Sequence, residues 1–597
     1  MNNPIYKTYQ LRRADYEKKL AQKKNQSNLL VSLRSLVFIS AAGLLIVYSF
    51  LSAKSIYLLF SGTLIVIFLL LIAKHNRIKA DIKYLEKLFH INDIALLRLS
   101  GKWTSFPNSG NRFINPEHPY SSDLNIFGQG SLFQYLNTTT SFMGEQKLSD
   151  LLSSRTGLNE IKHRQQAVTE LSSRLDWRQH FQAMGILDDI KQIKNPDKLL
   201  AWANEKPLLL DKYLLLYRLC PIITFTLAVL GYLHFIFPYL WILPLAIQII
   251  IVAFTEKLIY KTFGETGKTV NEIQRYSALL SCIEQESFKT PLLADLKLRL
   301  VTDGYTPSQQ IKSLYKIADR MTLRYSSIHL IINIGVLWDL HTLIKLESWK
   351  NKSGRSLRTW LDVVGEFEAL SSLAGLSHDH PGWVTPEISE CPPTFKATAL
   401  GHPLIKDDQR VSNDVSLANP GTILLITGSN MSGKSTLLRT VGINLVLAYA
   451  GSPVCADKLC CSLMDVYSSI QVNDNLKENV SAFYAELKRI KLIVDAAKTG
   501  EPILFLIDEI FKGTNSKDRI FGAKAVIRNL NSLSTIGLVS THDLELSQLE
   551  NENSLINNYH FTDKISGQEI SFDYRLKPGI SQTTNAIDLM RIIGIEL

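Results

Sequence analysis

A glycine-rich loop carries the clearest chemistry in this chain. An apolar run, Thr422–Thr427, precedes it, and a helix is expected to begin near Lys434. In such a loop, backbone N–H groups surround phosphate oxygens, the lysine reaches the terminal phosphates, and the next hydroxyl, that of Ser435, ligates Mg²⁺. The loop residues predicted to bind nucleotide are Gly428, Ser429, Asn430, Met431, Ser432, Gly433, Lys434, Ser435 and Thr436.

An acidic pair follows a second apolar run. Ile503–Ile507 has no polar alternation, which predicts a fully buried strand, and Asp508 and Glu509 come directly after it. Asp508 would hold Mg²⁺, and Glu509 would orient or deprotonate the water that attacks the γ-phosphate of ATP. The alternative interpretation of the pair is a solvated helix cap.

A histidine follows a third predicted strand. Gly537–Ser540 leads to Thr541 and His542, whose imidazole could contact the γ-phosphate or the attacking water. Taken alone, His542 could equally be an ordinary surface or cap histidine. The loop, the acidic pair and the histidine follow successive strands, and together they favour an ATPase with Lys434, Glu509 and His542 as its catalytic residues.

These segments resemble those of one ATPase family. Thr427–Thr436, with Asn-Met inside it, resembles the phosphate loop of the MutS family. Asp508–Ser516 resembles its second acidic motif, and Ser540–Leu546 resembles its histidine motif. The similarity runs from His402 to the C-terminus. The resemblance implies an α/β P-loop ATPase domain of the ABC/MutS kind, with ATP and Mg²⁺ as cofactors.

Weaker similarity extends upstream of the ATPase part. Segments between Asp123 and Val168 resemble the helical core of the MutS family, and Glu366–Ala374 resembles the helix that leads into its ATPase domain. The resemblance therefore implies an α-helical core and lever domain before the ATPase domain. It also implies a homodimer that clamps double-stranded DNA, while partner proteins stay unknown.

Two further residues receive roles from the resemblance alone. Ser481 lies in a segment that in the family reaches the nucleotide of the partner subunit, so it is expected to contact the partner's γ-phosphate. Tyr574 is expected to stack on adenine. An aromatic ring packed in a C-terminal strand is an equal alternative for Tyr574.

The chain also departs from the family pattern. The family's Gly-Arg after the acidic motif is Phe511-Lys512 here, its Asp-Gly is Asp518-Arg519, and its loop proline is Ser429. Mismatch-recognising members carry an N-terminal α/β domain with a Phe-x-Glu wedge, and no such domain is expected here. Phe263-Gly264-Glu265 is interpreted as a chance tripeptide.

Long apolar runs predict membrane helices. Ser35–Ala53 and Ser55–Ala73 are uncharged and each is long enough to cross a hydrocarbon core of roughly 30 Å. A third run, Leu219–Thr255, contains Gly231 and Pro238, which suggests a second hairpin. The sequence thus predicts about four transmembrane helices in two hairpins, the alternative being buried hairpins of a soluble protein.

Basic residues orient these predicted spans. Lys and Arg flank the outer ends of the first hairpin, and Arg218 and Lys257 flank the second. A multi-pass protein of a bacterial inner membrane is predicted, with both termini and the ATPase domain in the cytoplasm and the lipid bilayer as a partner. The net charge of +10 is explained by these flanks, although contact with DNA stays open. Six cysteines show no paired spacing and receive no metal.

Breakers and composition divide the chain. The run around Leu330–Trp338 is too short to span and is predicted to be core. The predicted divisions are 1–90 (basic arm and first hairpin), 91–120 (linker), 121–212 (helical core, first part), 213–255 (second hairpin), 256–375 (core and lever, second part), 376–400 (linker) and 401–597 (ATPase domain).

Three classes of function compete. The first is a membrane-anchored ATPase of the MutS kind that binds DNA, acting in mismatch repair or on recombination intermediates. The second is a transporter of the ABC type, against which stand the absence of a Leu-Ser-Gly-Gly signature and the scarcity of ionisable residues in the spans. The third is an ATP-switched membrane scaffold in which DNA plays no part.

Overall fold

The chain divides into two compact units, Met1–Trp103 with Leu175–Ile186, and Thr104–Arg174 with Leu187–Leu597. The computed structural model describes residues 4–50, 55–186, 195–206, 208, 214–266, 270–301, 304–390, 392–429, 431–471, 482–511, 515–566 and 569–580.

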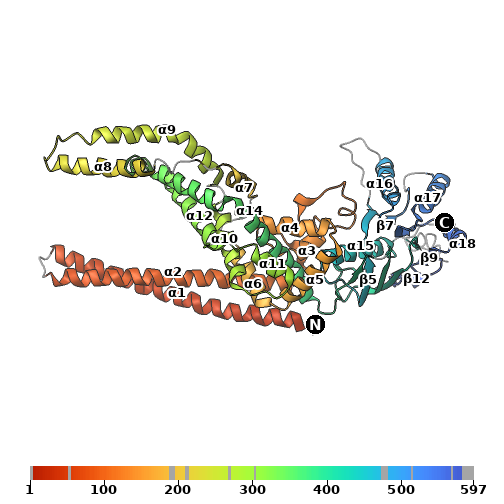
Figure 1. Cartoon of the computed structure of the whole chain (residues 1–597). Helices are drawn as coiled ribbons and strands as arrows, with labels where there is room; N and C mark the ends of the chain where they lie inside the picture. The colour runs from red at the N-terminus through yellow and green to blue at the C-terminus, as the bar shows by residue number, and fades with distance from the viewer. Residues whose placement is uncertain are drawn as a thin grey trace. The chain divides into compact units, whose positions relative to one another are not determined.

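The first unit is a long helical hairpin. Helix α1, Pro4–Phe50, lies antiparallel to α2, Ile56–Leu99, and α6, Leu175–Gly185, packs on α2 (Figure 1). Ion pairs join the N-terminal half of α1 to the C-terminal half of α2. They are Arg13–Asp93 at 3.1 Å, Lys23–Asp81 at 2.6 Å and Lys24–Glu86 at 2.9 Å. This half of the hairpin therefore has a water-facing character.

The other half of the hairpin has the opposite polarity. Large apolar side chains such as Ile39 and Leu70 are exposed, at 67% and 65%, whereas Ser61 is buried and donates a hydrogen bond to the carbonyl of Ala41 at 3.0 Å. Apolar groups outside and polar groups inside are what a hydrocarbon environment favours. The predicted spans 35–53 and 55–73 fall in this half, up to Phe50 and from Ser55 in the described residues.

Helix α2 is longer than predicted. The expected linker at 91–120 begins only after Leu99, because Ile91, Ala95 and Leu96 continue the helical spacing and are buried. Ala95 and Leu96 pack with Tyr9 of α1, and Ile91 packs with Ala183 of α6. The helical periodicity thus outweighs the polar residues that lie between these positions.

The helical part of the second unit surrounds one long helix, α14, Trp338–Asp379. Its other helices are α3 (Leu132–Leu136), α4 (Phe142–Ser153), α5 (Leu158–Ser172), α7 (Asp197–Asn204), α8 (Leu214–Tyr232), α9 (Ile242–Thr266), α10 (Val270–Gln285), α11 (Pro291–Leu298), α12 (Pro307–Asp319) and α13 (His329–Val336), with short 3₁₀ turns η1 (Trp103–Ser105), η2 (Asn111–Phe113) and η5 (Arg320–Tyr325).

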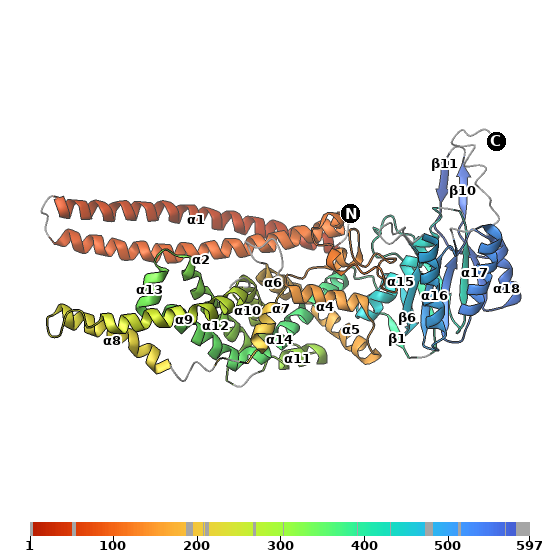
Figure 2. The same ribbon diagram turned by 90° about the horizontal axis from the view of Figure 1, so that it is seen from above.

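Helix α14 packs tightly against α4. Gly365 has no room for a side chain, since a Cβ there would lie 2.7 Å from the carbonyl oxygen of Met143. Buried Glu368 accepts hydrogen bonds from the Thr140 N–H at 2.7 Å and the Thr140 hydroxyl at 2.6 Å. Burial raises the pKa of Glu368. This contact ties the start of the helical core to the helix that leads to the sheets (Figure 2).

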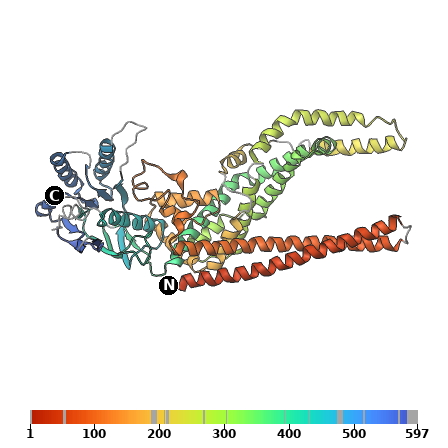
Figure 3. The same ribbon diagram turned by 180° about the vertical axis from the view of Figure 1, so that it is seen from behind.

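The second predicted hairpin corresponds to α8 and α9, which lie side by side and antiparallel (Figure 3). In the described residues, three helices are long and apolar enough to cross a membrane: α1, α2 and the Ile242–Tyr260 part of α9. The described apolar part of α8, Tyr217–Tyr232, is shorter. The bent pair α13 and α14 would make a fourth.

The prediction that Leu330–Trp338 is core is wrong for α13. Leu330 is 63% exposed and Ile331 is 74% exposed. The apolar side chains of α13 face outward because its polar side chains, His329 and Asn333, contact Asp339 in the protein. The chance tripeptide Phe263–Glu265 falls in the last turns of α9, and its side chains lie outside the described residues.

The C-terminal part of the second unit is an α/β domain. A six-stranded sheet has the order β12-β9-β4-β8-β7-β6, parallel throughout except for β12. Its strands are β4 (Ile423–Thr427), β6 (Asp465–Ser469), β7 (Ile503–Asp508), β8 (Thr535–Ser540), β9 (Ile556–His560) and β12 (Lys577–Pro578), and its helices are α15 (Lys434–Ala450), α16 (Ala482–Ala497), α17 (Ser516–Leu530) and α18 (Leu549–Glu552), with the turn η6 (Leu544–Gln548).

Two smaller sheets complete the domain. A four-stranded sheet has the order β1-β5-β2-β3, with β1 (Glu387–Ser389), β2 (Phe395–Leu400), β3 (Asn413–Leu417) and β5 (Lys458–Ser462), and β10 (Asp563–Ser566) pairs with β11 (Glu569–Phe572). The predicted linker 376–400 therefore contains the end of α14 and two strands. Every residue of β4, β7 and β8 is buried, as expected for central parallel strands covered on both faces.

Candidate nucleotide site

The phosphate loop connects β4 to α15, and its glycines are required by geometry. Gly428 and Gly433 have φ values of 143° and 108°, which only glycine adopts readily. A Cβ at Gly428 would lie 3.0 Å from Ser432 Oγ and 3.1 Å from the carbonyl oxygen of Phe561. The loop therefore turns sharply at both glycines and delivers the chain to the N-terminus of α15, where free N–H groups favour an anion.

Lys434 is the first residue of α15 and is almost fully buried, at 5% exposure. Its Nζ donates hydrogen bonds to the carbonyl oxygens of Gly428, at 2.9 Å, and Ser429, at 2.8 Å. The ammonium group is thus held inside the loop. The buried hydroxyls of Ser429 and Ser432 have no hydrogen-bond partner among the described residues, which is the situation that a phosphate oxygen would relieve.

Asp508 joins three elements at the edge of the sheet. One carboxylate oxygen accepts from the Ser435 hydroxyl at 2.5 Å, and the other accepts from the Ser540 hydroxyl at the end of β8. Two oxygen donors side by side, Ser435 and Asp508, fit Mg²⁺, which prefers hard oxygen ligands and completes its shell with water and substrate phosphate. Among the described residues, no group of three or more His, Cys, Asp or Glu could hold a metal by itself.

Glu509 and His542 face the same place. Glu509 Oε1 lies 3.0 Å from His542 Nε2, which in turn lies 3.2 Å from Lys434 Nζ. Glu509 has a φ of 54°, a strained value for a non-glycine residue, and its N–H is held by the Ser540 carbonyl at 3.0 Å. Both side chains remain partly exposed, at 28% for Glu509 and 37% for His542, so a carboxylate and an imidazole are presented beside the buried lysine.

A cavity of about 600 Å³ opens beside the loop. Its lining includes Lys434, Ser435, Thr436 and Glu509, as well as residues that the sequence motifs did not identify. These additional lining residues are Leu400, His402, Ile405, Gln409, Val411, Asn413, Leu437, Thr440 and Phe561. Its volume suits a nucleotide-sized ligand.

Comparison with known proteins agrees with this geometry. Residues 424–596 match the family model described as MutS domain V. The DNA mismatch repair protein MutS of Aquifex pyrophilus is 32% identical over 237 residues, which cover 39% of this chain and 27% of that protein. The DNA mismatch repair protein MutS of Chlorobium phaeobacteroides is 30% identical over 240 residues, with the same two coverages of 39% and 27%.

The C-terminal part of the chain therefore belongs to the MutS family. It matches only about a quarter of the length of these relatives, 27% in each case. The match from residue 424 includes the phosphate loop, the acidic pair and the histidine. The members of this MutS-family site that the structure brings together are Lys434, Ser435, Asp508, Glu509 and His542.

The remaining predicted residues have different positions. Tyr574 lies between β11 and β12, outside a strand, is 43% exposed, and its Cδ1 would lie 3.2 Å from a Cβ at Gly433. Met431 lines the cavity but is 85% exposed. Asn430 and Ser481 lie outside the described residues.

One departure from the MutS pattern has a structural partner. Arg519 of α17 forms a two-pronged ion pair with Asp543, with Nε and Nη2 each 2.8 Å from a carboxylate oxygen. Asp543 directly follows His542. A glycine at position 519 could not make this contact, so the departure fixes the segment that carries the histidine.

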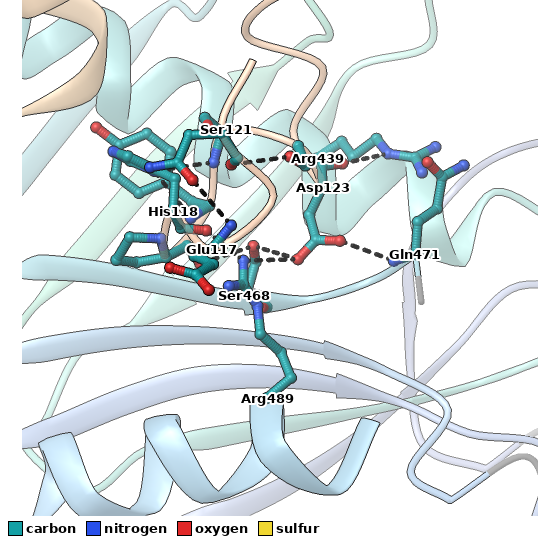
Figure 4. Close-up of polar contacts among 12 residues, drawn as sticks. Glu117, His118, Ser121, Asp123, Arg439, Ser468, Gln471 and Arg489 are labelled. Carbon is teal, nitrogen blue, oxygen red and sulfur yellow. Dashed lines mark hydrogen bonds and ion pairs between the residues drawn. The ribbon is translucent and has the colours of Figure 1, made fainter. Parts of the chain in front are cut away.

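Asp123 contacts the nucleotide helix through its main-chain carbonyl and the neighbouring strand end through its buried carboxylate. Asp123, 3% exposed, accepts from the Ser468 hydroxyl at 2.7 Å and from the Gln471 N–H at 2.9 Å (Figure 4). Arg489 of α16 lies 3.5 Å from the same carboxylate. Arg439, one turn after Ser435 on α15, donates to the Asp123 carbonyl at 2.9 Å. No sequence pattern assigned these residues a role.

The first prediction concerns Asp123. Asp123→Ala should lower the stability of the ATPase part by about 3 kcal/mol, because it leaves Ser468, the Gln471 N–H and Arg489 without their buried acceptor. Thermal unfolding of the full chain in detergent measures this. The control is Asp457→Ala, which removes an exposed aspartate of the same domain. Equal unfolding midpoints for the two variants would contradict the assignment.

The second prediction concerns His402. Burial, and then the charges of Arg439 and Arg410, lower its pKa to about 4, from a usual value near 6.5. On acidification, His402 is protonated in the unfolded chain at a higher pH than in the folded chain. Its contribution to the free energy of unfolding is therefore fully present above about pH 6.5 and falls by about 2 kcal/mol on acidification to pH 5.

Unfolding midpoints between pH 7.5 and pH 5 test the His402 prediction. His402→Asn keeps an acceptor where His402 Nδ1 now accepts from the Leu404 N–H, at 3.2 Å, and cannot be protonated in this range. The variant should therefore lose less stability on acidification than the parent. Parallel pH profiles would show that the imidazole does not titrate as assigned.

Proposed function

We propose that this chain is a membrane-anchored ATPase that works as a dimer and binds double-stranded DNA in an ATP-dependent way. The observation that carries the ATPase part is the convergence of Lys434, Ser435, Asp508, Glu509 and His542 at one edge of the sheet. The family match and the relatives, which are named DNA mismatch repair proteins, support the DNA part.

The nucleotide chemistry follows from these side chains. Lys434 exchanges its bonds to the loop carbonyls for terminal phosphate oxygens of ATP, and Ser435 and Asp508 hold Mg²⁺. The bound ion supplies charge neutralisation at the β- and γ-phosphates. Glu509 orients a water and takes its proton, and His542, 3.0 Å from that carboxylate, positions it or contacts the γ-phosphate.

The dimer and the base contact complete the proposed site. Ser481 of each subunit reaches the γ-phosphate held by the other, so ATP binding closes the two domains and hydrolysis releases them. Tyr574, half-exposed next to Gly433, stacks on the adenine. The Asp123 contacts support transmission of closure to the helical core, because Arg439 lies on the helix that begins at Lys434.

Membrane anchoring rests on inverted polarity. The exposed apolar halves of α1 and α2, and the exposed apolar residues of α8 and α9, favour lipid contact. The proposed arrangement is four spans in two hairpins, with the ATPase domain and both termini on the cytoplasmic side of a bacterial inner membrane. The second candidate function is an ATP-switched membrane scaffold that does not bind DNA. The DNA-binding test below distinguishes it from the proposed function.

The third prediction separates binding from hydrolysis. Glu509→Gln should retain labelled ATP and lower the turnover number by about 10²- to 10⁴-fold, because the amide cannot take the proton. Lys434→Ala should weaken ATP retention itself. Phosphate release and filter retention of labelled nucleotide measure the two effects. Turnover of Glu509→Gln at the parent rate would remove Glu509 from the role of base.

The fourth prediction concerns DNA. The detergent-solubilised full chain should bind duplex DNA of arbitrary sequence, with affinity falling steeply between about 50 and 200 mM salt as phosphate contacts are screened. ATP should change the affinity for the parent but not for Lys434→Ala. Fluorescence anisotropy of a labelled duplex measures both. Absence of binding at low salt, with and without ATP, would leave the scaffold as the function.

A further inference from the structure

Helix α13 has an inverted distribution of polarity. Its apolar side chains point outward, with Leu330 63%, Ile331 74% and Val336 47% exposed. Its polar side chains, His329 and Asn333, are one turn apart and both meet the start of α14. A helix on a water-facing surface would show the reverse arrangement.

The polar contacts hold α13 in place. His329 Nε2 lies 3.1 Å from a carboxylate oxygen of Asp339, and the Asn333 side-chain oxygen accepts from the Asp339 N–H at 2.9 Å. Arg324 lies 3.4 Å from the same carboxylate, which is 2% exposed. The polar face of α13 is therefore satisfied within the protein, and only its apolar face remains for another partner.

Helix α13 alone is too short to cross a membrane, and a sharp bend separates it from α14. Eight residues extend about 12 Å, well short of the hydrocarbon thickness. Leu337 has a φ of 51°, and the axis turns by 71° between α13 and α14. After this bend α14 continues into the protein core, where Leu340, Leu343 and Ile344 are buried.

The bend places α13 at the base of the α8–α9 hairpin. Leu337, Leu340 and Ile344 form a buried cluster against Tyr217 of α8 and Val252 of α9. Figure 2 shows α13 lying across this hairpin rather than along it. Helices that cross a bilayer and a short helix transverse to them at their base are the geometry of spans with an interfacial helix.

Basic side chains gather at the same level. Arg218 follows Tyr217, Lys345 follows Ile344, and the carbonyl of Arg320 accepts from the Trp338 indole N–H at 3.2 Å. None of the three basic residues forms an ion pair with another described residue, and all are exposed. Partial desolvation, and then the charges of Arg320 and Arg218, lower the pKa of Lys345, as expected for neighbouring cations.

We propose that α13 is an interfacial membrane helix, with Leu330 and Ile331 inserted among acyl chains and Arg218, Arg320 and Lys345 on the headgroups of anionic phospholipids. This inference rests on the membrane anchoring proposed above and extends it. The occupant is lipid because α13 contacts α9, and both helices carry exposed apolar side chains, among them Ile331 on α13 and Phe254 on α9. The unneutralised cations match a phosphate-bearing boundary.

The test uses the full chain in nanodiscs made of equal parts of phosphatidylglycerol and phosphatidylcholine. The photoreactive residue p-benzoylphenylalanine replaces Ile331 in one variant, Phe254 of α9 in a second and Leu533 of the ATPase domain in a third. Phe254 is 84% exposed and Leu533 is 81% exposed, so both controls are accessible. Mass spectrometry then identifies the lipid or peptide attached after illumination.

Lipid adducts at positions 331 and 254, with none at 533, are the expected result. Lipid at 254 but none at 331, or peptide adducts from another part of the chain or a second copy at 331, would overturn the inference while membrane anchoring stands. Absence of lipid at both positions would overturn the inference together with the proposed second hairpin.

A separate experiment tests whether the basic residues contact anionic headgroups. Adducts at position 331 should be enriched in phosphatidylglycerol, and Arg320→Gln with Lys345→Gln should reduce that enrichment by roughly fivefold for each charge removed. Lys312→Gln with Lys316→Gln removes two exposed charges from α12 as the matched control and should leave it unchanged. Equal recovery of the two lipids in the parent protein would overturn the role of the basic residues.

Discussion

The meeting of parallel strands at one edge of the six-stranded sheet is the constraint on which the candidate site depends. Because β8 lies between β4 and β7, the loop after β4, Asp508 at the end of β7 and His542 after β8 all emerge at neighbouring positions. The bond from Ser540 to Asp508 fixes this edge laterally, and the bond from Ser435 ties it to α15. An antiparallel order would send these groups to opposite edges.

Asp123 is one of the residues that connect this edge of the sheet to the rest of the second unit. Asp123 bonds to the strand end at Ser468 and to Gln471, which comes immediately before an undescribed segment that contains Ser481. Its main-chain carbonyl also accepts a hydrogen bond from Arg439, on the helix that carries Lys434. A displacement of α15 by nucleotide would therefore act first on a group that is buried and has several bonds to lose.

The sequence predicted the phosphate-binding and catalytic residues of the site better than the other residues that line its cavity. Strands β4, β7 and β8 were predictable because short, unbroken apolar runs end directly in motif residues. His402 and Asn413 escaped because they come from a segment without periodicity, and strands β1 and β2 escaped because prolines between them indicated a linker. The prediction for helix α13 was wrong because a short, mostly apolar helix has the same composition whether its apolar side chains are buried or exposed. Only the positions of His329 and Asn333, which face the protein, distinguish these two arrangements.

The hydrogen bond from Ser61 to the carbonyl of Ala41 has a mechanical consequence for the first hairpin. Sliding one helix past the other by a turn, about 5.4 Å, would leave the Ser61 hydroxyl without its acceptor among apolar side chains. The same movement would separate three ion pairs in the other half of the hairpin. Piston-like motion between α1 and α2 is therefore disfavoured from both ends. Any displacement that reaches these helices would be passed on as tilt or rotation of the pair as one rod.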